Sequence, residues 1–319
     1  MERVRLGKTD IETVPLGVGT WAWGDSLYWT YGKDYDSSQI KSAYDAAIAA
    51  GITLFDTAEV YGWGESERLI GQFIKPGDRP NLHLATKYMP LPWRIQPQVV
   101  HDAITHSLER LRLKTIDLYQ VHQPCAFLMS QKTLLTALAE EVKQGRIRAI
   151  GVSNYSAKQM REAHDILAAH RVPLAANQVL YSILDRQIET NGIRDTAREL
   201  GITILAYSPL AQGLLTGKFS LTRTPKGARQ WIPRYGADGI AQIQPLLRVM
   251  RQVADQYQRT LSQIALNWLI CQGQGAVIPI PGAKNAAQAE DNAGALGWTL
   301  DRVDVAAIAR EARACQPKS

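Results

Sequence analysis

The sequence predicts a (β/α)₈ barrel, an α/β fold in which eight parallel strands alternate with helices. Short apolar runs recur along the 319 residues, and amphipathic helical patterns separate them. These runs are almost continuously apolar, which is typical of strands that are buried on both faces of a parallel sheet. Eight strand–helix units at this spacing favour a closed barrel over an open doubly wound sheet, and the length suits one barrel.

A short hairpin around Gly7–Asp10 is expected first, covering the bottom of the barrel. The eight strands are then expected at 14–19, 52–55, 82–86, 116–121, 147–153, 174–179, 202–208 and 276–281. The clearest helical patterns span 38–50, 97–111, 132–144, 156–170 and 188–200. Cap-like serines open two of them (Ser37, Ser156), and glycines stand where three should end (Gly51, Gly145, Gly201).

Two longer segments interrupt this rhythm, at 210–239 and after Gly297. The first predicts a long loop on the face formed by the C-terminal ends of the strands. Neither an internal repeat nor a low-complexity linker is present, so residues 1–319 are expected to form a single domain.

Composition and charge exclude several classes of protein. The net charge is +6, but the Lys and Arg residues are dispersed, which argues against nucleic-acid binding and favours anionic small ligands. The three cysteines lack CxxC spacing, so neither a disulfide framework nor a metal site is expected. No signal sequence or membrane-spanning run is apparent, so we expect a cytoplasmic protein without membrane partners, either a monomer or a weak oligomer.

Four polar residues follow apolar runs in the first 125 positions. Asp56 follows ITLF, Tyr61 comes five residues later, Lys87 closes LHLAT and His122 closes IDLYQV. In a (β/α)₈ barrel the active site lies at the C-terminal ends of the strands. These side chains are therefore expected to meet at one face of the barrel.

The four residue types suit proton transfer to a carbonyl oxygen. Hydride addition to a carbonyl carbon leaves negative charge on the oxygen, and Tyr61 can donate the proton that neutralises it. A phenol has a pKa of about 10, which a nearby Lys87 ammonium would lower. Asp56 would hold Lys87, and His122 would direct the carbonyl. Each residue also has a structural interpretation, such as a plain Lys–Asp salt bridge, but the convergence of all four favours catalysis.

A series of segments then resembles the aldo-keto reductase family along nearly the whole chain. They are LGVGTWAWG, FDTAEVYGWGESERLIG, LATKYMP, IDLYQVHQP, IGVSNYS, NQVLYSILDR, AYSPLAQGLLTGK and IPIPGAKNAAQAEDNAGALGW, in the family's order. The resemblance implies a catalytic tetrad of Asp56, Tyr61, Lys87 and His122. It also implies NADPH as the coenzyme.

The resemblance assigns the remaining coenzyme contacts residue by residue. Three positions match those that grip the nicotinamide carboxamide, and an aromatic matches the one that stacks on its ring: Ser153, Asn154, Gln178 and Tyr207. The pyrophosphate loop corresponds to Ser208, Leu210, Gly213 and Lys218. The segment around the adenosine and 2′-phosphate corresponds to Gly282, Ala283, Lys284, Gln288, Asp291 and Asn292. Gly19, Thr20, Trp21 and Asp56 complete the expected coenzyme site.

Two positions depart from the family pattern. Some members carry a cation at the positions of Gly282 and Gln288, and this chain does not. Lys284 is then the main candidate to bind the 2′-phosphate, which keeps NADPH as the expected coenzyme. A competing GxGxxA motif at Gly17–Ala22 resembles a dinucleotide fingerprint, but no helical pattern follows it, so we interpret it as accidental.

Aromatic residues near the first three βα loops predict the substrate wall, with Trp23, Trp29, Tyr88 and Trp93 as candidates. Trp231 and Tyr235 are expected to close over the site from the long insertion. The leading interpretation is an NADPH-dependent reductase of aldehydes and ketones, including reactive carbonyls such as methylglyoxal. Alternatives are a pyridoxal reductase, which the C-terminal segment resembles, and a coenzyme-sensing regulatory subunit.

Overall fold

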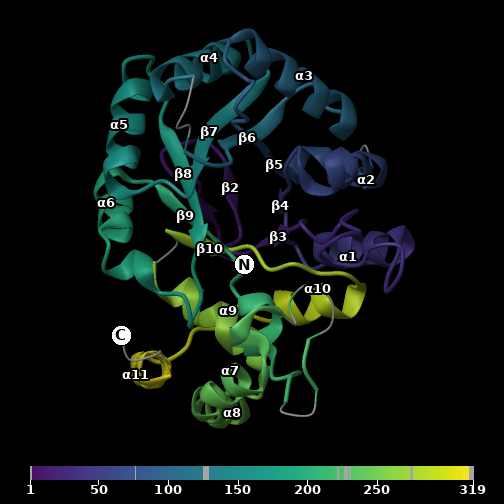
Figure 1. Ribbon diagram of the computed structural model, residues 1–319, viewed down its shortest axis with the longest axis vertical. Helices are drawn as coiled ribbons and strands as arrows, with labels where there is room; N and C mark the ends of the chain where they lie inside the picture. The colour runs from purple at the N-terminus through teal and green to yellow at the C-terminus, as the bar shows by residue number, and fades with distance from the viewer. Residues whose placement is uncertain are drawn as a thin grey trace.

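The computed structural model describes residues 2–75, 77–124, 129–220, 223–225, 229, 231–273 and 276–315. Eight parallel strands form a nearly closed barrel with helices outside it (Figure 1). The strands are β3 (Gly17–Gly19), β4 (Leu54–Asp56), β5 (His83–Tyr88), β6 (Ile116–Val121), β7 (Ile147–Ser153), β8 (Leu174–Leu180), β9 (Thr203–Tyr207) and β10 (Val277–Pro279). They pair in chain order, and the predicted (β/α)₈ barrel is confirmed.

The barrel closes between its first strand and the segment after its last. The amide of Gly19 donates to the carbonyl of Pro281 at 3.0 Å, and Gly19 forms a parallel bridge with Gly282. A Cβ at position 19 would lie 2.7 Å from the carbonyl oxygen of Ile280. Glycine is therefore required where the two edges meet.

The predicted N-terminal hairpin is present as β1 (Val4–Arg5) and β2 (Glu12–Thr13), which pair antiparallel. Its loop amide at Gly7 donates to Thr203 Oγ1 at 2.8 Å, at the N-terminal end of β9. Leu6 and Ile11 are buried against side chains from the barrel interior. The hairpin therefore covers the end of the barrel opposite the expected active site.

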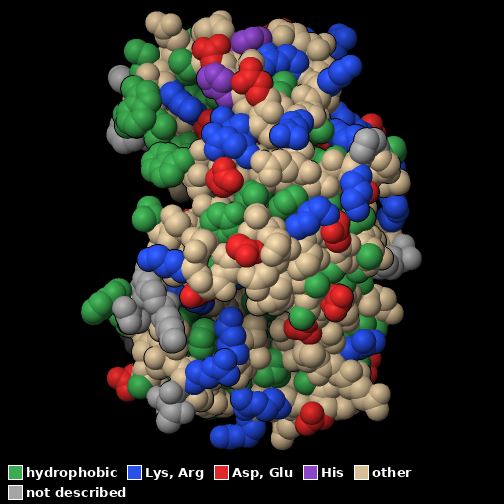
Figure 2. Space-filling model, turned by 90° about the vertical axis from the view of Figure 1, so that its right-hand side faces the viewer, with side chains coloured by type: hydrophobic (Ala, Val, Ile, Leu, Met, Phe, Trp, Pro, Cys, Tyr) green, Lys and Arg blue, Asp and Glu red, His purple; other side chains and the backbone are tan. Residues whose placement is uncertain are grey.

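The helices have the bounds α1 (Ser37–Ala49), α2 (Glu65–Phe73), α3 (Gln98–Leu111), α4 (Gln131–Lys143), α5 (Ala157–Ala168), α6 (Ile193–Leu200), α7 (Ala237–Gln242), α8 (Gln244–Tyr257), α9 (Leu261–Cys271), α10 (Ala286–Ala293) and α11 (Arg302–Ala314). No described helix is long and apolar enough to span a bilayer. On the face in Figure 2, basic side chains are interspersed with acidic ones over most of the surface, as expected for dispersed charge.

Most predicted helix ends are close to the observed ones. Ser156 caps α5, and the glycines at 51, 145 and 201 adopt the left-handed conformation that ends a helix. Ser37 is not the N-cap, because the carboxylate of Asp36 accepts hydrogen bonds from the backbone amides of Ser38 and Gln39. The helix therefore begins at Ser37, one residue earlier than predicted. The helix expected at 188–200 begins only at Ile193, since a 3₁₀ turn and a left-handed Gly192 precede it.

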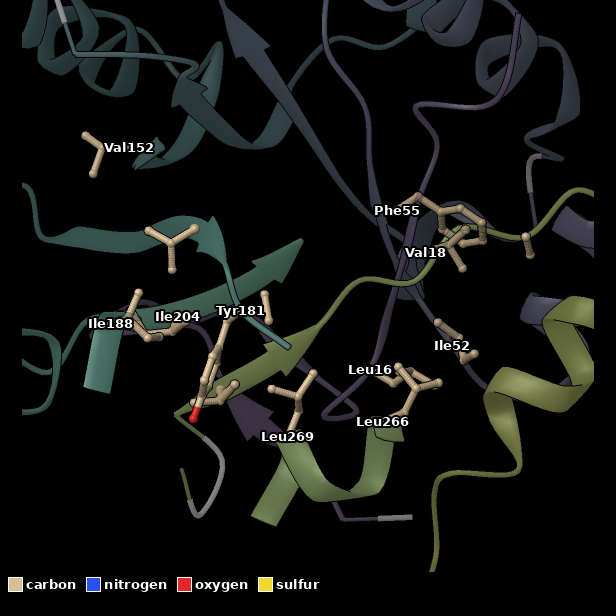
Figure 3. Close-up of a cluster of buried hydrophobic side chains, with 14 of the residues drawn as sticks. Leu16, Val18, Ile52, Phe55, Val152, Tyr181, Ile188, Ile204, Leu266 and Leu269 are labelled. Atoms are coloured by element: carbon tan, nitrogen blue, oxygen red, sulfur yellow. The ribbon is translucent and has the colours of Figure 1, made fainter. Parts of the chain in front are cut away.

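The buried interior has two apolar clusters and one polar region. Between strands and helices, side chains such as Phe55 on β4, Ile204 on β9 and Leu266 on α9 form the outer core (Figure 3). Inside the barrel, small and branched side chains from the strands fill the end near the hairpin. At the opposite end the interior becomes polar, with Asp56, Lys87, Gln120 and Gln178 all buried. The expected active site lies at this end.

Candidate active site

A cavity of about 920 Å³ opens at the C-terminal ends of the strands. Most of the predicted site residues contribute to its wall: Gly19, Thr20, Trp21, Trp29, Asp56, Tyr61, His122, Ser153, Asn154, Gln178, Tyr207, Ser208, Leu210, Gly213, Lys218, Gly282, Lys284, Gln288, Asp291 and Asn292. Strand ends from β3 to β10 thus supply polar groups to one continuous space, as the barrel topology requires.

The four candidate catalytic residues converge, since Asp56, Tyr61 and His122 line the cavity and the fully buried Lys87 contacts two of them. Lys87 Nζ donates to Asp56 Oδ2 at 2.5 Å and lies 3.4 Å from Tyr61 Oη. The rings of Tyr61 and His122 meet edge to face, with their centroids 5.7 Å apart. Lys87 also donates to the carbonyl of Thr57 at 2.7 Å and has no exposed surface. The ammonium is therefore held between a carboxylate, a carbonyl and the phenol.

Burial and neighbouring charged groups together set the pKa values of the phenol and the ammonium. Burial raises the pKa of Tyr61 above 10, and the neighbouring Lys87 charge offsets this only in part. Lys87 thus lowers the pKa of the phenol, as expected, but burial outweighs its effect. For Lys87, burial is outweighed by Asp56 and Tyr61, so its pKa is raised. The resting site holds a protonated phenol beside an ammonium, which is a proton donor with its counter-charge already in place.

Asp56 has a second set of partners that the sequence did not reveal. Gln120 Nε2 and Gln178 Nε2 each donate to Asp56 Oδ1 at 2.8 Å. Gln120 lies within the apolar run IDLYQV and is fully buried. A polar side chain inside a buried strand is the signal that would have pointed to it.

His122 is held as a neutral imidazole. Burial, together with the nearby Lys87 charge, lowers its pKa to about 3. Its Nδ1 is buried and has no hydrogen-bond partner among the described residues. The ring can therefore hydrogen-bond a carbonyl group in the cavity without itself gaining or losing charge near neutral pH.

We expect the ring signals of His122 in an NMR titration to stay constant from about pH 5 to about pH 8, whereas an ordinary exposed histidine titrates near 6.5. The lowered pKa of about 3 is the reason. A His122→Asn variant identifies the signals. A midpoint for His122 close to 6.5 would contradict the neutral role.

One wall of the cavity consists of Asn154, Tyr207 and Ser208, which lie at or just after the ends of β7 and β9 and are called the polar seat below. Asn154 accepts from Tyr207 Oη at 3.1 Å and donates to Ser153 Oγ at 3.1 Å. Asn154 and Ser208 both have left-handed backbones, with φ of 61° and 51°. Such strained positions in non-glycine residues concentrate at functional sites. They turn the two loops so that amide groups and an aromatic ring face the same space.

A second wall is basic and belongs to the long insertion. Lys218 and Arg229 lie beside the turn at Gly213, and Arg229 donates to the carbonyl of Gln212 at 3.1 Å. Arg229 Nε is buried and has no partner among the described residues. Burial and the charge of Arg229 lower the pKa of Lys218. Arg229 was not predicted, because an arginine in a long loop carries no sequence signal of its own.

Lys284 completes the basic edge of the cavity. Its Nζ lies 4.8 Å from the Trp29 ring centroid and 4.1 Å from that of Tyr35, and it donates to the Trp29 carbonyl at 3.2 Å. Burial and repulsion from Arg229 and Lys218 lower its pKa to about 8. Three cations thus gather at one end of the cavity, which favours an anionic ligand with more than one charged group.

The remaining predicted contacts at this end are partly engaged within the protein. Asp291 accepts from Thr260 Oγ1 at 2.7 Å, and Asn292 donates to the carbonyl of Gly282 at 3.3 Å. Gln288 accepts from the Lys284 amide at 2.9 Å. Ala283 is buried and its carbonyl accepts from Trp23 Nε1.

Of the four predicted substrate-wall aromatics, the structure places only Trp29 at the cavity. Trp23 and Tyr88 are buried in the core, and Trp93 is 72% exposed outside the cavity wall. Because these three residues do not line the cavity, we remove them from the site. Spacing along the sequence does not tell which side of a loop an aromatic side chain faces.

Other aromatic and loop predictions also change. Trp231 is exposed and Tyr235 is packed in the core, and neither residue lines the cavity. Cys125, one of the three cysteines, lies outside the described residues. No helix follows the motif at Gly17–Ala22, since the next helix begins at Ser37, and its interpretation as accidental stands.

Comparison with known proteins agrees with this geometry. A chloroplastic pyridoxal reductase of Arabidopsis thaliana is 38% identical over 310 residues, covering 94% of this chain and 82% of its own. An NADH-specific methylglyoxal reductase of Escherichia coli is 30% identical, with 99% and 100% covered. A Klebsiella pneumoniae aldo-keto reductase solved with NADPH superposes with a TM-score of 0.74 at 25% identity, covering 97% and 95%. The aldo/keto reductase family model matches residues 15–312, and the chain belongs to this family of oxidoreductases.

Proposed function

We propose that the protein reduces aldehydes and ketones to alcohols with NADPH, using Tyr61 as the proton donor. The observation that carries this proposal is the buried Lys87 ammonium, 2.5 Å from Asp56 and 3.4 Å from the Tyr61 hydroxyl, where Asp56 and Tyr61 line a large cavity. A plain structural salt bridge does not require a phenol beside it at the mouth of a barrel.

The described residues fit a nicotinamide coenzyme. The cavity has room for a ligand of this size, its basic edge offers Lys218, Arg229 and Lys284, and its polar seat offers amides. The indole Nε1 of Trp29 and Nε of Arg229 are buried donors that lack partners among the described residues. Buried donors of this kind are normally satisfied by a ligand or water. The coenzyme, when bound, supplies the hydride.

Each of the four candidate catalytic residues then has a role in the reaction. His122, neutral and beside Tyr61, hydrogen-bonds the substrate oxygen and directs it toward the phenol. Tyr61 donates its proton to that oxygen as negative charge develops there. Lys87 stabilises the resulting phenolate through its fixed ammonium, and Asp56 keeps that ammonium charged and oriented. Because the donor set is pre-organised, little reorganisation accompanies proton transfer.

Replacing Lys284 with Ala is expected to lower the affinity for NADPH by about 10- to 100-fold, which corresponds to the usual contribution of a charged hydrogen bond. The affinity for NADH should fall far less. Lys284 lines the basic edge of the cavity and belongs to the segment that resembles the family's 2′-phosphate site, and NADH lacks that phosphate. Since the pKa of Lys284 is about 8 in the free enzyme, NADPH affinity should also fall as the pH rises past 8. Fluorescence titration of both coenzymes measures these affinities.

Lys218→Ala is the matched control for this prediction. Lys218 lies beside the turn that resembles a pyrophosphate loop, a group that both coenzymes share, so both affinities should fall together. An equal loss of NADPH and NADH affinity in Lys284→Ala would mean that Lys284 does not read the 2′-phosphate.

A panel of carbonyl compounds tests the substrate class. Methylglyoxal and other small aldehydes are the leading candidates. Pyridoxal is the second, because the Arabidopsis relative is named a pyridoxal reductase. The ratio of kcat/KM for pyridoxal to that for methylglyoxal separates the two. No coenzyme oxidation with any member of the panel would argue against the proposed function.

A further inference from the structure

Gln120 is a buried residue whose side-chain amide contacts the candidate catalytic residue Asp56. It lies on β6 directly beside Lys87 in the strand register and has no exposed surface. On its other side it pairs with Gly151 on β7, where a Cβ would lie 2.9 Å from Gln120 Cγ. The absence of a side chain at Gly151 therefore makes the space that the Gln120 side chain occupies.

Two amides share one oxygen of Asp56. Gln120 and Gln178 each donate to Oδ1 at 2.8 Å, while Lys87 takes Oδ2. Gln178 also donates to Gln120 Oε1 at 3.3 Å. Gln178 lines the cavity, whereas Gln120 is not part of the cavity wall. The two amides are thus equivalent toward the carboxylate but differ in their access to a ligand.

A buried carboxylate needs hydrogen-bond donors in addition to its ion-pair partner. If Gln178 turns toward a ligand in the cavity, Asp56 loses one donor, and Gln120 is the amide that remains. We propose that Gln120 is a positioning residue: its amide holds the Asp56 carboxylate against Lys87, so that Gln178 is free to bind the coenzyme. This inference rests on the proposed function for its catalytic part, but the contact itself does not.

The contact is tested in the coenzyme-free protein by a double-mutant cycle. Gln120→Leu is expected to lower the melting temperature by several degrees, as the loss of a charged hydrogen bond does in a domain of this size. In an Asp56→Ala background the same change should be neutral or stabilising, because the NH2 group of Gln120 no longer has its carboxylate acceptor. Asn177→Leu is the control, because Asn177 is a buried amide on β8 that donates to the Tyr155 carbonyl. Its shift in melting temperature should add to that of Asp56→Ala when the two changes are combined.

The positioning role is tested by binding and turnover. In Gln120→Leu, coenzyme must compete with Asp56 for Gln178, so its Kd should rise by about tenfold. The kcat should fall by about 10-fold or more, while the KM of the carbonyl changes little. In Gln120→Glu, the introduced carboxyl can donate to Asp56 only when protonated. Turnover should therefore approach that of the parent at low pH and fall as the pH rises.

These outcomes separate the inference from the proposed function. Additive shifts in melting temperature, or Gln120→Leu with unchanged Kd and kcat, would overturn the inference. Non-additive shifts together with a raised coenzyme Kd, in a protein that reduces no carbonyl, would support the role of Gln120 toward Asp56 and Gln178 and contradict the proposed reaction instead.

Discussion

Tyr61→Phe is expected to lower kcat by about 10²- to 10⁴-fold, the usual contribution of a general acid. Phe keeps the ring that packs against His122 and removes only the hydroxyl beside Lys87. Coenzyme affinity should change by less than about twofold, since the hydroxyl is a donor to the substrate oxygen. Single-turnover kinetics with NADPH and methylglyoxal measure the step directly.

A neighbouring phenol provides the control. Tyr28→Phe removes a hydroxyl that donates to Gln212 at 2.7 Å. Its kcat should stay within a few-fold of the parent, as expected for a hydrogen bond outside the reacting groups. If Tyr61→Phe retained full turnover, the phenol would not be the proton donor, and the assignment of all four residues would lose its basis.

Lys87→Met should impair both folding and turnover. Breaking a buried ion pair by removal of one partner costs about 3–5 kcal/mol, because the remaining charge is left without compensation. Lys87 and Asp56 have side-chain exposures of 0% and 2%, so solvent cannot replace the lost partner. Turnover should fall by at least about 10²-fold, since the phenolate of Tyr61 would form without a counter-charge. Denaturant unfolding and kcat measure the two effects.

The double variant Lys87→Met with Asp56→Asn distinguishes the two effects. It removes both charges, so the free energy of unfolding should recover in part, whereas turnover should not. Arg161 and Glu199 form an exposed pair whose N–O distance is 2.6 Å, and Arg161→Met is the surface control. It should change stability far less. Equal destabilisation at the two pairs would contradict the buried-charge argument.

The barrel could be predicted because each strand is a bounded apolar run, and the topology then fixes where the strands end. Asp56, Lys87 and His122 were found for this reason, since each directly follows or closes such a run. Helix ends were less certain where two capping residues compete, as at Asp36 and Ser37. There the carboxylate satisfied the free amides first.

The rest of the site depended on three-dimensional placement. Trp23 and Trp29 are six residues apart in one aromatic-rich loop, yet one is in the core and the other at the cavity. Gln120 was missed because it stands inside an apolar run that otherwise predicts only burial. Arg229 lies in a long loop, whose path no periodic pattern describes. The sequence therefore predicts polar residues at strand ends better than polar residues inside strands or on long loops.

The transfer of hydride from the coenzyme to a carbonyl carbon is the most direct test of the proposed function. NADPH that carries deuterium at the transferred position can be incubated with the protein and a panel of aldehydes, ketones and pyridoxal, and the alcohol products analysed by mass spectrometry. We predict alcohols that contain one deuterium from the coenzyme for the parent protein, and a loss of most of this product in Tyr61→Phe. Coenzyme binding without labelled alcohol from any carbonyl would contradict the assignment of the site as a carbonyl reductase.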